Sequence, residues 1–313
     1  MIWNGVFVSG VGTYLPDSVP VDSVRGISAI VARRSGYEGI AISHFPSYVM
    51  AGIAARSAID NSSHHDEIIS PIIYADTPLH SEHAAPACYV QRLLQQEKSL
   101  AFELHAASDA GVIGLEVAAR LMVGDPDLNT GLVITTSRCP EQLNRWISGV
   151  LIGDGAAAVV LSTKGGFARL IASKTTSVPD FEVFFRNKST QAGAWALDEI
   201  YLSPYIETLA HEVSTTITAV LDDANISIAD ISHFCLPALP LLAAQEIYLK
   251  RNEIPLEKTS CTKLMRHAHI GPCDQFIAID RLVTEGALKS GDFIMTLGGG
   301  LGWRFSCLLL QVV

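Results

Sequence analysis

Short apolar segments alternate with stretches of helical periodicity along almost the whole chain, and this alternation restricts the fold more than any single motif. The first half alternates strand-like and helix-like segments and ends in consecutive strands, and the second half repeats this order. Apolar strands that alternate with helices are typical of a mostly parallel sheet covered on both faces. The sequence therefore predicts a duplicated α/β architecture, which fits a chain of 313 residues.

The expected elements follow from hydrophobic spacing and from Gly and Pro positions. Strands are predicted over 5–12, 68–75, 99–104, 130–136, 154–162, 167–173, 233–236, 292–297 and 303–312. Helices are predicted over 48–60, 86–94, 112–122, 204–224, 241–250 and 271–286. The strand over 5–12 is expected to enter a turn at its Gly-rich end, 10–12, and the Gly-rich segment 298–302 is expected to be a turn. We expect the two halves to be 1–163 and 164–313, because Lys164 and two glycines break the pattern there.

Composition excludes several classes of protein. Lys and Arg number 22 and Asp and Glu 32, so the net charge is −10, and the absence of a dense basic run argues against a nucleic-acid binder. Hydrophobic residues make up 49% and charged residues 17%, which excludes a disordered chain. No uncharged apolar stretch reaches ~18 residues, so no membrane span is predicted.

The sequence also allows expectations about the location of the protein and the role of its cysteines. The N-terminal segment lacks the basic and long apolar regions of a signal peptide, so we expect a cytoplasmic protein. Six cysteines are scattered without a CxxC pair. This spacing fits neither a disulfide scaffold nor a zinc site, and no bound metal is expected.

Ser108 lies in a small-residue turn between a predicted strand and a predicted helix. The segment 105–111 reads His-Ala-Ala-Ser-Asp-Ala-Gly. A Ser in such a turn exposes its hydroxyl at the carboxyl end of the strand. Its own N–H then lies at a helix N-terminus, where partial positive charge stabilises an oxyanion. This is the arrangement of a nucleophile elbow, although the GxSxG pattern is absent. The alternative is that Ser108 only caps the helix.

A second candidate is the segment 266–274, Arg-His-Ala-His-Ile-Gly-Pro-Cys-Asp. His269 and Asp274 stand five residues apart across a Gly-Pro turn at a predicted helix start. A turn there would fold the carboxylate back toward the imidazole and complete a Ser-His-Asp arrangement. The alternative is an Asp that serves the helix N-terminus and a His that packs against the turn.

The third candidate is Gly298-Gly-Gly-Leu-Gly302. Backbone without side chains lets a ligand approach closely, and an N–H here, which we assign to Gly299, would join that of Ser108 in an oxyanion hole. One such donor typically lowers a barrier by ~3 kcal/mol. An ordinary turn is the alternative. The segment lacks the GxGxxG register and a following helix, so no dinucleotide site is predicted.

Several segments, in this order, resemble those of the ketoacyl-ACP synthase III-like enzymes of the thiolase superfamily, over nearly the whole chain. They are the opening VSGVGTYLPD, Pro86–Gln91, the nucleophile turn Phe102–Gly111, the GDGA strand Gly153–Val160, Gly291-Asp292 and the closing Gly298–Trp303. The resemblance implies a thiolase fold, with two βαβαβαββ halves stacked as five layers, α-β-α-β-α. It also implies a homodimer, with a heterodimer with a paralogue as the alternative.

The chain departs from the condensing members of that family at three positions. They carry a Cys nucleophile where this chain has Ser108, a His where it has Ala238, and an Asn where it has His269. The His and Asn of those enzymes stabilise the enolate formed when a malonyl group loses CO2, so carbanion stabilisation is expected to be poorer here. A Ser hydroxyl needs a general base, which His269 would supply.

The departures resemble a subgroup of Ser-dependent starter-unit enzymes and non-elongating acyltransferases, which often show a His-x-Gly-x-x-Asp segment. The resemblance implies a Ser108 acyl-enzyme, with His269 as base and Asp274 as its orienting partner. An acyl-CoA or acyl-ACP thioester would be the substrate, in polyketide-type secondary metabolism, and no cofactor would be permanently bound. The alternatives are a non-catalytic partner of an active subunit, a decarboxylative condensing enzyme and a thioesterase.

Four basic residues are candidates for docking an acidic carrier protein or coenzyme A: Lys250, Arg251, Lys263 and Arg266. Basic side chains near a substrate entrance would steer an acidic partner. The alternative for each of them is an ordinary solvated side chain.

Overall fold

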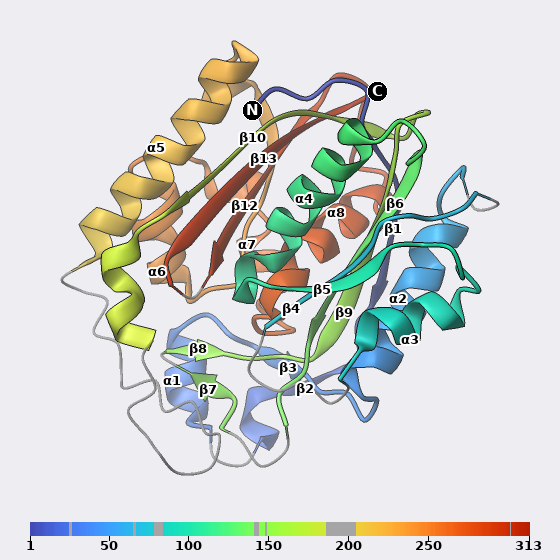
Figure 1. Ribbon diagram of the computed structural model, residues 1–313. Coiled ribbons are helices and arrows are strands. Elements are labelled where there is room, and N and C mark those ends of the chain that lie inside the picture. The colour runs from blue at the N-terminus through green and yellow to red at the C-terminus, as the bar shows by residue number, and fades with distance from the viewer. Residues whose placement is uncertain are drawn as a thin grey trace.

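The computed structural model describes residues 1–24, 27–64, 67–77, 84–140, 144–147, 149–185, 205–300 and 302–313. Its central feature is a nine-stranded sheet with the order β11-β12-β13-β10-β1-β9-β6-β4-β5 (Figure 1). The strands are β1 (Phe7–Tyr14), β4 (Ile72–Asp76), β5 (Ala101–His105), β6 (Thr130–Ser137), β9 (Gly155–Ser162), β10 (Ala168–Ser177), β11 (Ile231–Cys235), β12 (Phe293–Gly300) and β13 (Arg304–Val312). Two small two-stranded sheets pair β2 (Ser18–Pro20) with β3 (Gly39–Ala41), and β7 (Trp146–Ile147) with β8 (Val150–Leu151).

The strand order reveals two similar halves. In the first, β5, β4 and β6 are parallel, and β9 and β1 follow antiparallel. In the second, β11 and β12 are parallel, and β13 and β10 follow antiparallel. A single parallel bridge from Thr259 to Phe234 occupies the place that β5 has in the first half. Strands β1 and β10 join the halves through a short antiparallel contact. The division at 163/164 falls between β9 and β10, and as a domain boundary it stays a prediction.

Helices form three layers around these strands (Figure 1). Helices α2 (Ser47–Asp60) and α3 (Pro86–Leu93) cover the outer face of the first half. Helices α4 (Ala110–Gly124) and α8 (Asp274–Thr284) lie in the middle and contact strands of both halves. Helix α5 (Ile206–Ala224) and the segment α6 (Leu241–Ala244), which continues as a π-helix over Gln245–Leu249, cover the other outer face. The predicted five-layer arrangement of two duplicated halves is confirmed.

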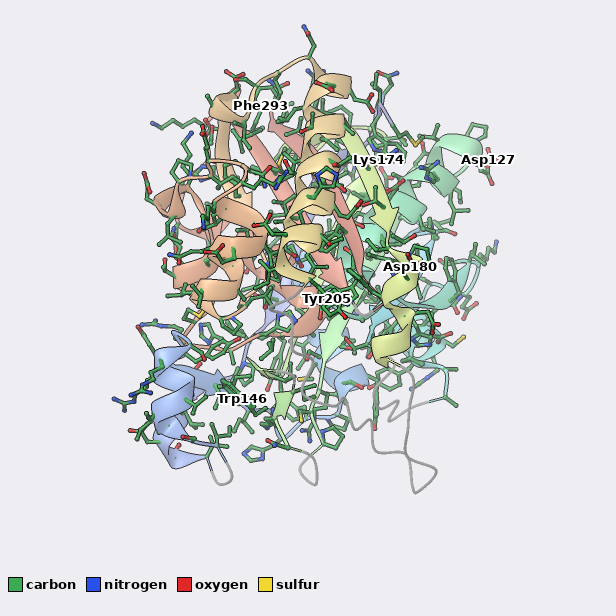
Figure 2. The ribbon with its side chains drawn as sticks, turned by 90° about the vertical axis from the view of Figure 1, so that its left-hand side faces the viewer. Asp127, Trp146, Lys174, Asp180, Tyr205 and Phe293 are labelled. Atoms are coloured by element: carbon green, nitrogen blue, oxygen red, sulfur yellow. The ribbon has the colours of Figure 1, made fainter. Side chains whose placement is uncertain are left out.

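Small residues allow the middle layer to pack on both sides. A Cβ on Gly111 would lie 2.6 Å from the carbonyl of Pro272, and one on Gly114 would lie 2.8 Å from a methyl of Val133. Helix α5 is amphipathic instead, as expected for an outer layer. Figure 2 faces this layer, with α5 running in front of the strands and Tyr205 just before its first turn. None of the described helices is long and apolar enough to cross a membrane.

Two Gly-rich segments predicted as turns are strands instead. Gly10 and Gly12 lie inside β1. They are glycines because Cβ atoms at these positions would overlap the backbone of α2 at Ala58. Gly298–Gly300 completes β12 and pairs with the first residues of β13. The turn prediction was wrong at both places for the same reason: the glycines serve close packing of an extended chain and do not reverse its direction.

Other elements were not predicted. They are β2, β3, β7, β8, α1 (Ala29–Arg34), α7 (Cys261–Leu264) and the 3-10 turns Val21–Ser23, Pro179–Phe185, Ile228–Asp230 and Leu256–Lys258. Two further 3-10 turns, Ala107–Asp109 and Gly271–Cys273, fall where a small-residue turn and the start of a helix were predicted. All of them are short except the turn at 179–185. Segments of two to six residues carry too little periodicity to be separated from loops.

Candidate active site

Ser108 sits at a sharp turn between β5 and α4. Ala107 just before it has φ = 54°, in the left-handed region that non-glycine residues adopt at a cost of about 1–3 kcal/mol. A 3-10 turn over Ala107–Asp109 then leads into the 15-residue helix α4. The side chain of Ser108 is partly buried. The predicted strand–turn–helix is therefore present, and Ser108 lies at the positive end of a helix dipole.

The structure brings Ser108, His269 and Asp274 into one hydrogen-bonded row. The Oγ atom of Ser108 lies 2.8 Å from Nε2 of His269, and Nδ1 of His269 lies 2.6 Å from Oδ2 of Asp274. His269 is 4% exposed and Asp274 is fully buried. With its Nδ1 proton donated to the carboxylate, His269 presents the lone pair of Nε2 to the Ser108 hydroxyl. This is the relation between a nucleophile, a base and an orienting acid.

Asp274 is fixed by backbone donors as well as by His269. Its Oδ1 accepts the N–H of Ile270 at 2.9 Å, and its Oδ2 accepts the N–H of Ala238 at 2.6 Å. It is also the first residue of α8. The backbone donors that Asp274 accepts lie outside α8, so the sequence alternative, in which it serves the start of the helix, stays a prediction.

The backbone of His269 is held by the end of β8 and the residues after it. Its N–H donates to the carbonyl of Leu151, and its carbonyl accepts the N–H of Gly153, both at 2.9 Å. A Cβ on Gly153 would overlap a carbonyl two residues before His269. Asp154, next in the chain, is buried and receives two N–H groups of Arg145 at 2.8 Å. The GDGA segment therefore positions the imidazole.

Ala238 supports the row through its main chain. Its N–H donates to Asp274, and its carbonyl accepts the hydroxyl of Tyr37 at 2.9 Å. Ala238 is fully buried. This position, where the family resemblance implies an imidazole in condensing enzymes, therefore offers no titratable side chain.

Gly299 lies in β12 opposite Phe305 and is partly exposed, whereas Gly298 and Gly300 are buried. A Cβ on Gly299 would overlap the hydroxyl of Tyr248. The assignment of the Ser108 and Gly299 N–H groups to an oxyanion hole stays a prediction.

The four candidate docking residues do not belong to the Ser108 row. Lys250 lies 3.3 Å from Glu246 and Arg251 3.5 Å from Glu207, as exposed ion pairs. Lys263 lies 3.4 Å from Glu285. Such surface pairs contribute ~0–1 kcal/mol each and leave the side chains available to a partner. Arg266 is exposed. Their role in docking stays a prediction.

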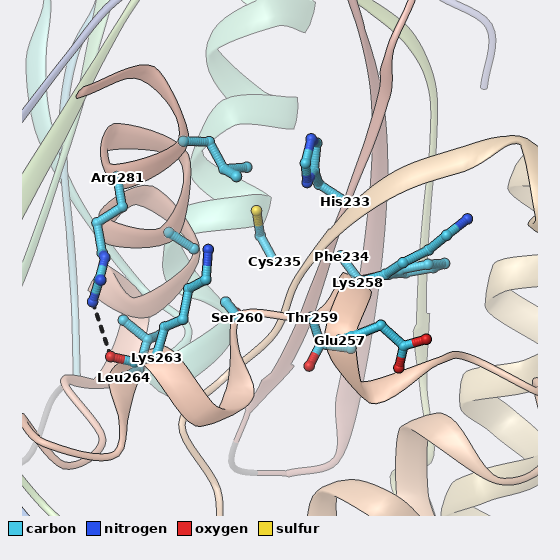
Figure 3. A pocket seen from close by; sticks show the side chains of 12 residues that line it. His233, Phe234, Cys235, Glu257, Lys258, Thr259, Ser260, Lys263, Leu264 and Arg281 are labelled. Atoms are coloured by element: carbon cyan, nitrogen blue, oxygen red, sulfur yellow. Dashed lines mark hydrogen bonds between the residues drawn. The ribbon is translucent and has the colours of Figure 1, made fainter. Parts of the chain in front are cut away.

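Lys263 also lines a small pocket of about 30 Å³, between the end of β11 and helices α7 and α8 (Figure 3). Arg281 donates to the carbonyl of Lys263 at 2.9 Å and closes one side of it. None of Ser108, His269 and Asp274 lines this pocket, and its volume suits a water molecule and not an acyl chain.

Sequence reasoning missed the residues packed behind the nucleophile turn. Asp109 is fully buried directly after Ser108, and Tyr248 lies on the π-helical segment against Gly299. A charged residue inside an apolar strand–turn–helix was a readable signal for Asp109, whereas nothing in sequence brings Tyr248 to this place. Across the described ranges, no group of three or more His, Cys, Asp or Glu side chains is arranged to hold a metal ion.

Two family models match the chain. The N-terminal one, 3-oxoacyl-[acyl-carrier-protein (ACP)] synthase III, matches residues 102–179, and the one for the C terminal of the same enzymes matches residues 221–312. A curated relative, the beta-ketoacyl-[acyl-carrier-protein] synthase III of Wolbachia pipientis, is 26% identical over 98% of this chain and 99% of its own length.

Solved structures of similar fold agree with the family models and the curated relative. A protein described as ChlB3, an acyltransferase, superposes with a TM-score of 0.91 at 27% identity, covering 98% of each chain. The 3-oxoacyl-(acyl carrier protein) synthase III of Pseudomonas aeruginosa superposes with a TM-score of 0.84 at 20% identity, covering 99% of this chain and all of the other, a likeness of fold. The chain therefore belongs to the ketoacyl-ACP synthase III-like proteins of the thiolase superfamily, a family of acyl-transfer and condensing enzymes.

Proposed function

We propose that this protein is an acyltransferase that moves an acyl group from a coenzyme A or acyl carrier protein thioester, through an ester on Ser108, to an acceptor. The observation that carries the proposal is the row in which Ser108 Oγ lies 2.8 Å from His269 Nε2, and His269 Nδ1 lies 2.6 Å from Asp274 Oδ2. The similarity to ChlB3, described as an acyltransferase, supports it.

In the first step, His269 Nε2 takes the hydroxyl proton while Ser108 Oγ attacks the thioester carbonyl. The C–S bond breaks, and the departing thiolate takes the proton back from the imidazolium, which leaves the acyl ester on Ser108. In the second step, His269 removes the proton of the acceptor, the acceptor attacks the ester, and Ser108 Oγ recovers its proton. Asp274 holds the imidazole in the required tautomer and stabilises its cation. The N–H groups of Ser108 and Gly299 would stabilise the oxyanion.

Transfer is favoured over decarboxylative condensation by the residue at 238. An enolate formed by loss of CO2 would need hydrogen-bond donors, and Ala238 supplies no side-chain donor while its N–H is already engaged by Asp274. Because the residues of the housekeeping condensing enzymes are absent, we place the protein in polyketide-type secondary metabolism.

Product analysis tests the reaction type. The protein is incubated with acyl and malonyl thioesters, with and without hydroxyl, amine and thiol acceptors. The proposal expects acylated acceptor to exceed free acid, and no CO2 release from the malonyl donor above that of Ser108→Ala. Free acid alone would establish a thioesterase, and CO2 with a lengthened product would establish a condensing enzyme. No turnover with any donor, together with co-purification of a Cys-containing paralogue, would support a non-catalytic partner.

A further inference from the structure

Four polar side chains form a continuous row from the nucleophile turn to Glu116, midway along helix α4. Oδ2 of Asp109 lies 2.8 Å from the hydroxyl of Ser306, which lies 2.9 Å from the hydroxyl of Thr175, which lies 3.1 Å from Oε2 of Glu116. The four residues come from the Ser108 turn, β13, β10 and α4. Asp109 and Ser306 are buried, and the side chain of Glu116 is 14% exposed beside the exposed Arg120. The row thus links the active-site turn to the surface.

If both carboxyls are ionised, this row has too few protons to make a hydrogen bond at each of its contacts. Three oxygen–oxygen contacts at hydrogen-bond distance need three protons, and the hydroxyls of Ser306 and Thr175 carry one each. If Ser306 donates to Asp109 and Thr175 donates to Glu116, the two hydroxyls face each other through lone pairs alone. A third proton on one of the two carboxyls resolves this. Every link is then a hydrogen bond that runs in one direction along the row.

Building on the proposed function of Ser108, we propose that Asp109 carries this third proton. As a neutral acid that donates to Ser306, it positions the nucleophile turn against the Gly298–Gly300 strand.

The surroundings of the two carboxyls assign the proton to Asp109. The other oxygen of Glu116, Oε1, accepts a hydrogen bond from Nη2 of Arg120 at 2.5 Å, so this carboxyl is paired with a cation. Asp109 is fully buried, and burial raises its pKa to about 8, while the hydrogen bond from Ser306 and the charge of Arg304 oppose the shift only in part. The negative charge of Glu116 raises the pKa of Asp109 further.

The groups on the other elements packed against this turn leave that assignment in place. Tyr248, on the π-helical segment, is buried, and burial raises the pKa of its phenol, so it stays neutral. Cys273, in the 3-10 turn before α8, is buried as well, and burial raises the pKa of its thiol. His269 faces Ser108 through Nε2. On strand β12, Gly298 and Gly300 face Asp109, and neither has a titratable side chain.

A neutral Asp109 suits its contacts with β12, and a charged one does not. Its Oδ1 has no hydrogen-bond partner within the described part of the chain, and a Cβ on Gly298 would overlap it. A Cβ on Gly300 would lie 2.9 Å from the Cβ of Asp109. Asp109 therefore fills the space between the nucleophile turn and the strand that bears Gly299. An ionised carboxylate here would leave a charged Oδ1 buried without a hydrogen bond from the described residues, and it would repel the oxyanion that forms beside Ser108 and Gly299.

The first test is the pH dependence of Ser108 acylation in wild type, Asp109→Asn and Asp127→Asn. Asn at 109 keeps the size and donates from Nδ2 to Ser306 but does not ionise, and the exposed Asp127 controls for loss of one charge. We expect the wild-type and Asp127→Asn rates to fall about tenfold per pH unit above an apparent pKa near 8. We expect Asp109→Asn to keep the wild-type plateau and lose this fall. The same alkaline fall in Asp109→Asn, or none in wild type, would overturn the proposal.

A second test does not depend on activity, so that failure of the proposed function stays distinguishable. The native state holds a proton on Asp109 that the unfolded chain releases above about pH 4, so this group lowers the free energy of unfolding as pH rises toward 8. Asp109→Asn should therefore gain stability over wild type progressively across that window, and the infrared band of a buried carboxylic acid should disappear in this variant. If the stability difference between Asp109→Asn and wild type is constant with pH, and Asp109→Asn retains the infrared band, a protonated Asp109 is refuted even if Ser108 is acylated. The expected stability difference in a protein that no thioester acylates would refute only the acyl-enzyme.

Discussion

Asp274 shows at the scale of single residues how one carboxylate combines structural and chemical work. It accepts backbone N–H groups from Ile270 and Ala238 and the ring N–H of His269. All of these partners are donors, so only an oxygen acceptor fits each position. The same contacts that join the Ala238 segment to α8 therefore select the His269 tautomer that leaves Nε2 free to take a proton from Ser108.

Replacement of Asp274 by Asn tests this selection. An amide must turn its NH2 group toward one of the N–H donors, and when that group faces His269 the imidazole protonates on Nε2 instead of Nδ1. We expect Asp274→Asn to lower the rate of Ser108 acylation by about 10²–10⁴-fold. Stopped-flow release of the thiol measures this rate, and circular dichroism checks the fold. A rate within threefold of wild type would show that His269 does not depend on this carboxylate.

At the scale of elements, the final residues of β12 are glycines because other elements occupy the space of their side chains. Gly298 faces Asp109 from the nucleophile turn, Gly299 faces Tyr248 from the π-helical segment, and Gly300 faces the carbonyl of Ala106. π-Helical segments are frequent at functional sites, and this one places a phenol beside the predicted oxyanion hole. The strand is thus shaped by three neighbours.

Gly299→Ala measures how tightly Tyr248 is packed there. The new methyl group would overlap the Tyr248 hydroxyl, so we expect a loss of about 1–3 kcal/mol in the free energy of unfolding. Tyr248→Phe in the same chain should restore about half of it. Gly124→Ala is the matched control, because a Cβ there meets nothing within 4 Å. Urea titration gives the free energy of unfolding of Gly299→Ala, of Gly299→Ala with Tyr248→Phe, and of Gly124→Ala. If Tyr248→Phe restores none of the stability that Gly299→Ala loses, the predicted packing of Tyr248 against this position is contradicted.

The elements that sequence predicts well are those with sustained periodicity. Helix α2 and strand β6 begin and end within one residue of expectation, because apolar spacing reports burial directly. The spacing of His269 and Asp274 predicted the contact that the structure contains. The strand at Gly298–Gly300 was mistaken for a turn, and Tyr248 was missed. In both cases the cause is a tertiary contact between segments remote in sequence, which local patterns do not encode.

At the scale of the whole molecule, the duplication places the row between the two halves. Ser108 comes from the first half, and His269 and Asp274 from the second, so the middle helices α4 and α8 hold the row together. The net charge of −10 means that an acidic carrier protein is repelled by the molecule as a whole. Productive docking would then need a local basic surface, for which Lys250 and Arg251 are the adjacent candidates.

Charge reversal tests that surface. We expect Lys250→Glu with Arg251→Glu to raise KM for an acyl carrier protein thioester about tenfold at low salt, and added salt to reduce the difference. The control substrate is the acyl N-acetylcysteamine thioester, whose leaving group is uncharged, and its KM should stay within about twofold. Equal effects on both donors, or a difference insensitive to salt, would show that these two residues do not dock the carrier.

The most direct test of the account locates the acyl group itself. The protein is mixed with a panel of short acyl thioesters, quenched in acid, digested and mapped by mass spectrometry, alongside Ser108→Ala and His269→Ala. We expect an acyl ester on Ser108 in wild type, none in Ser108→Ala, and slow formation in His269→Ala. An acyl group on another residue, or an adduct that persists in Ser108→Ala, would contradict it.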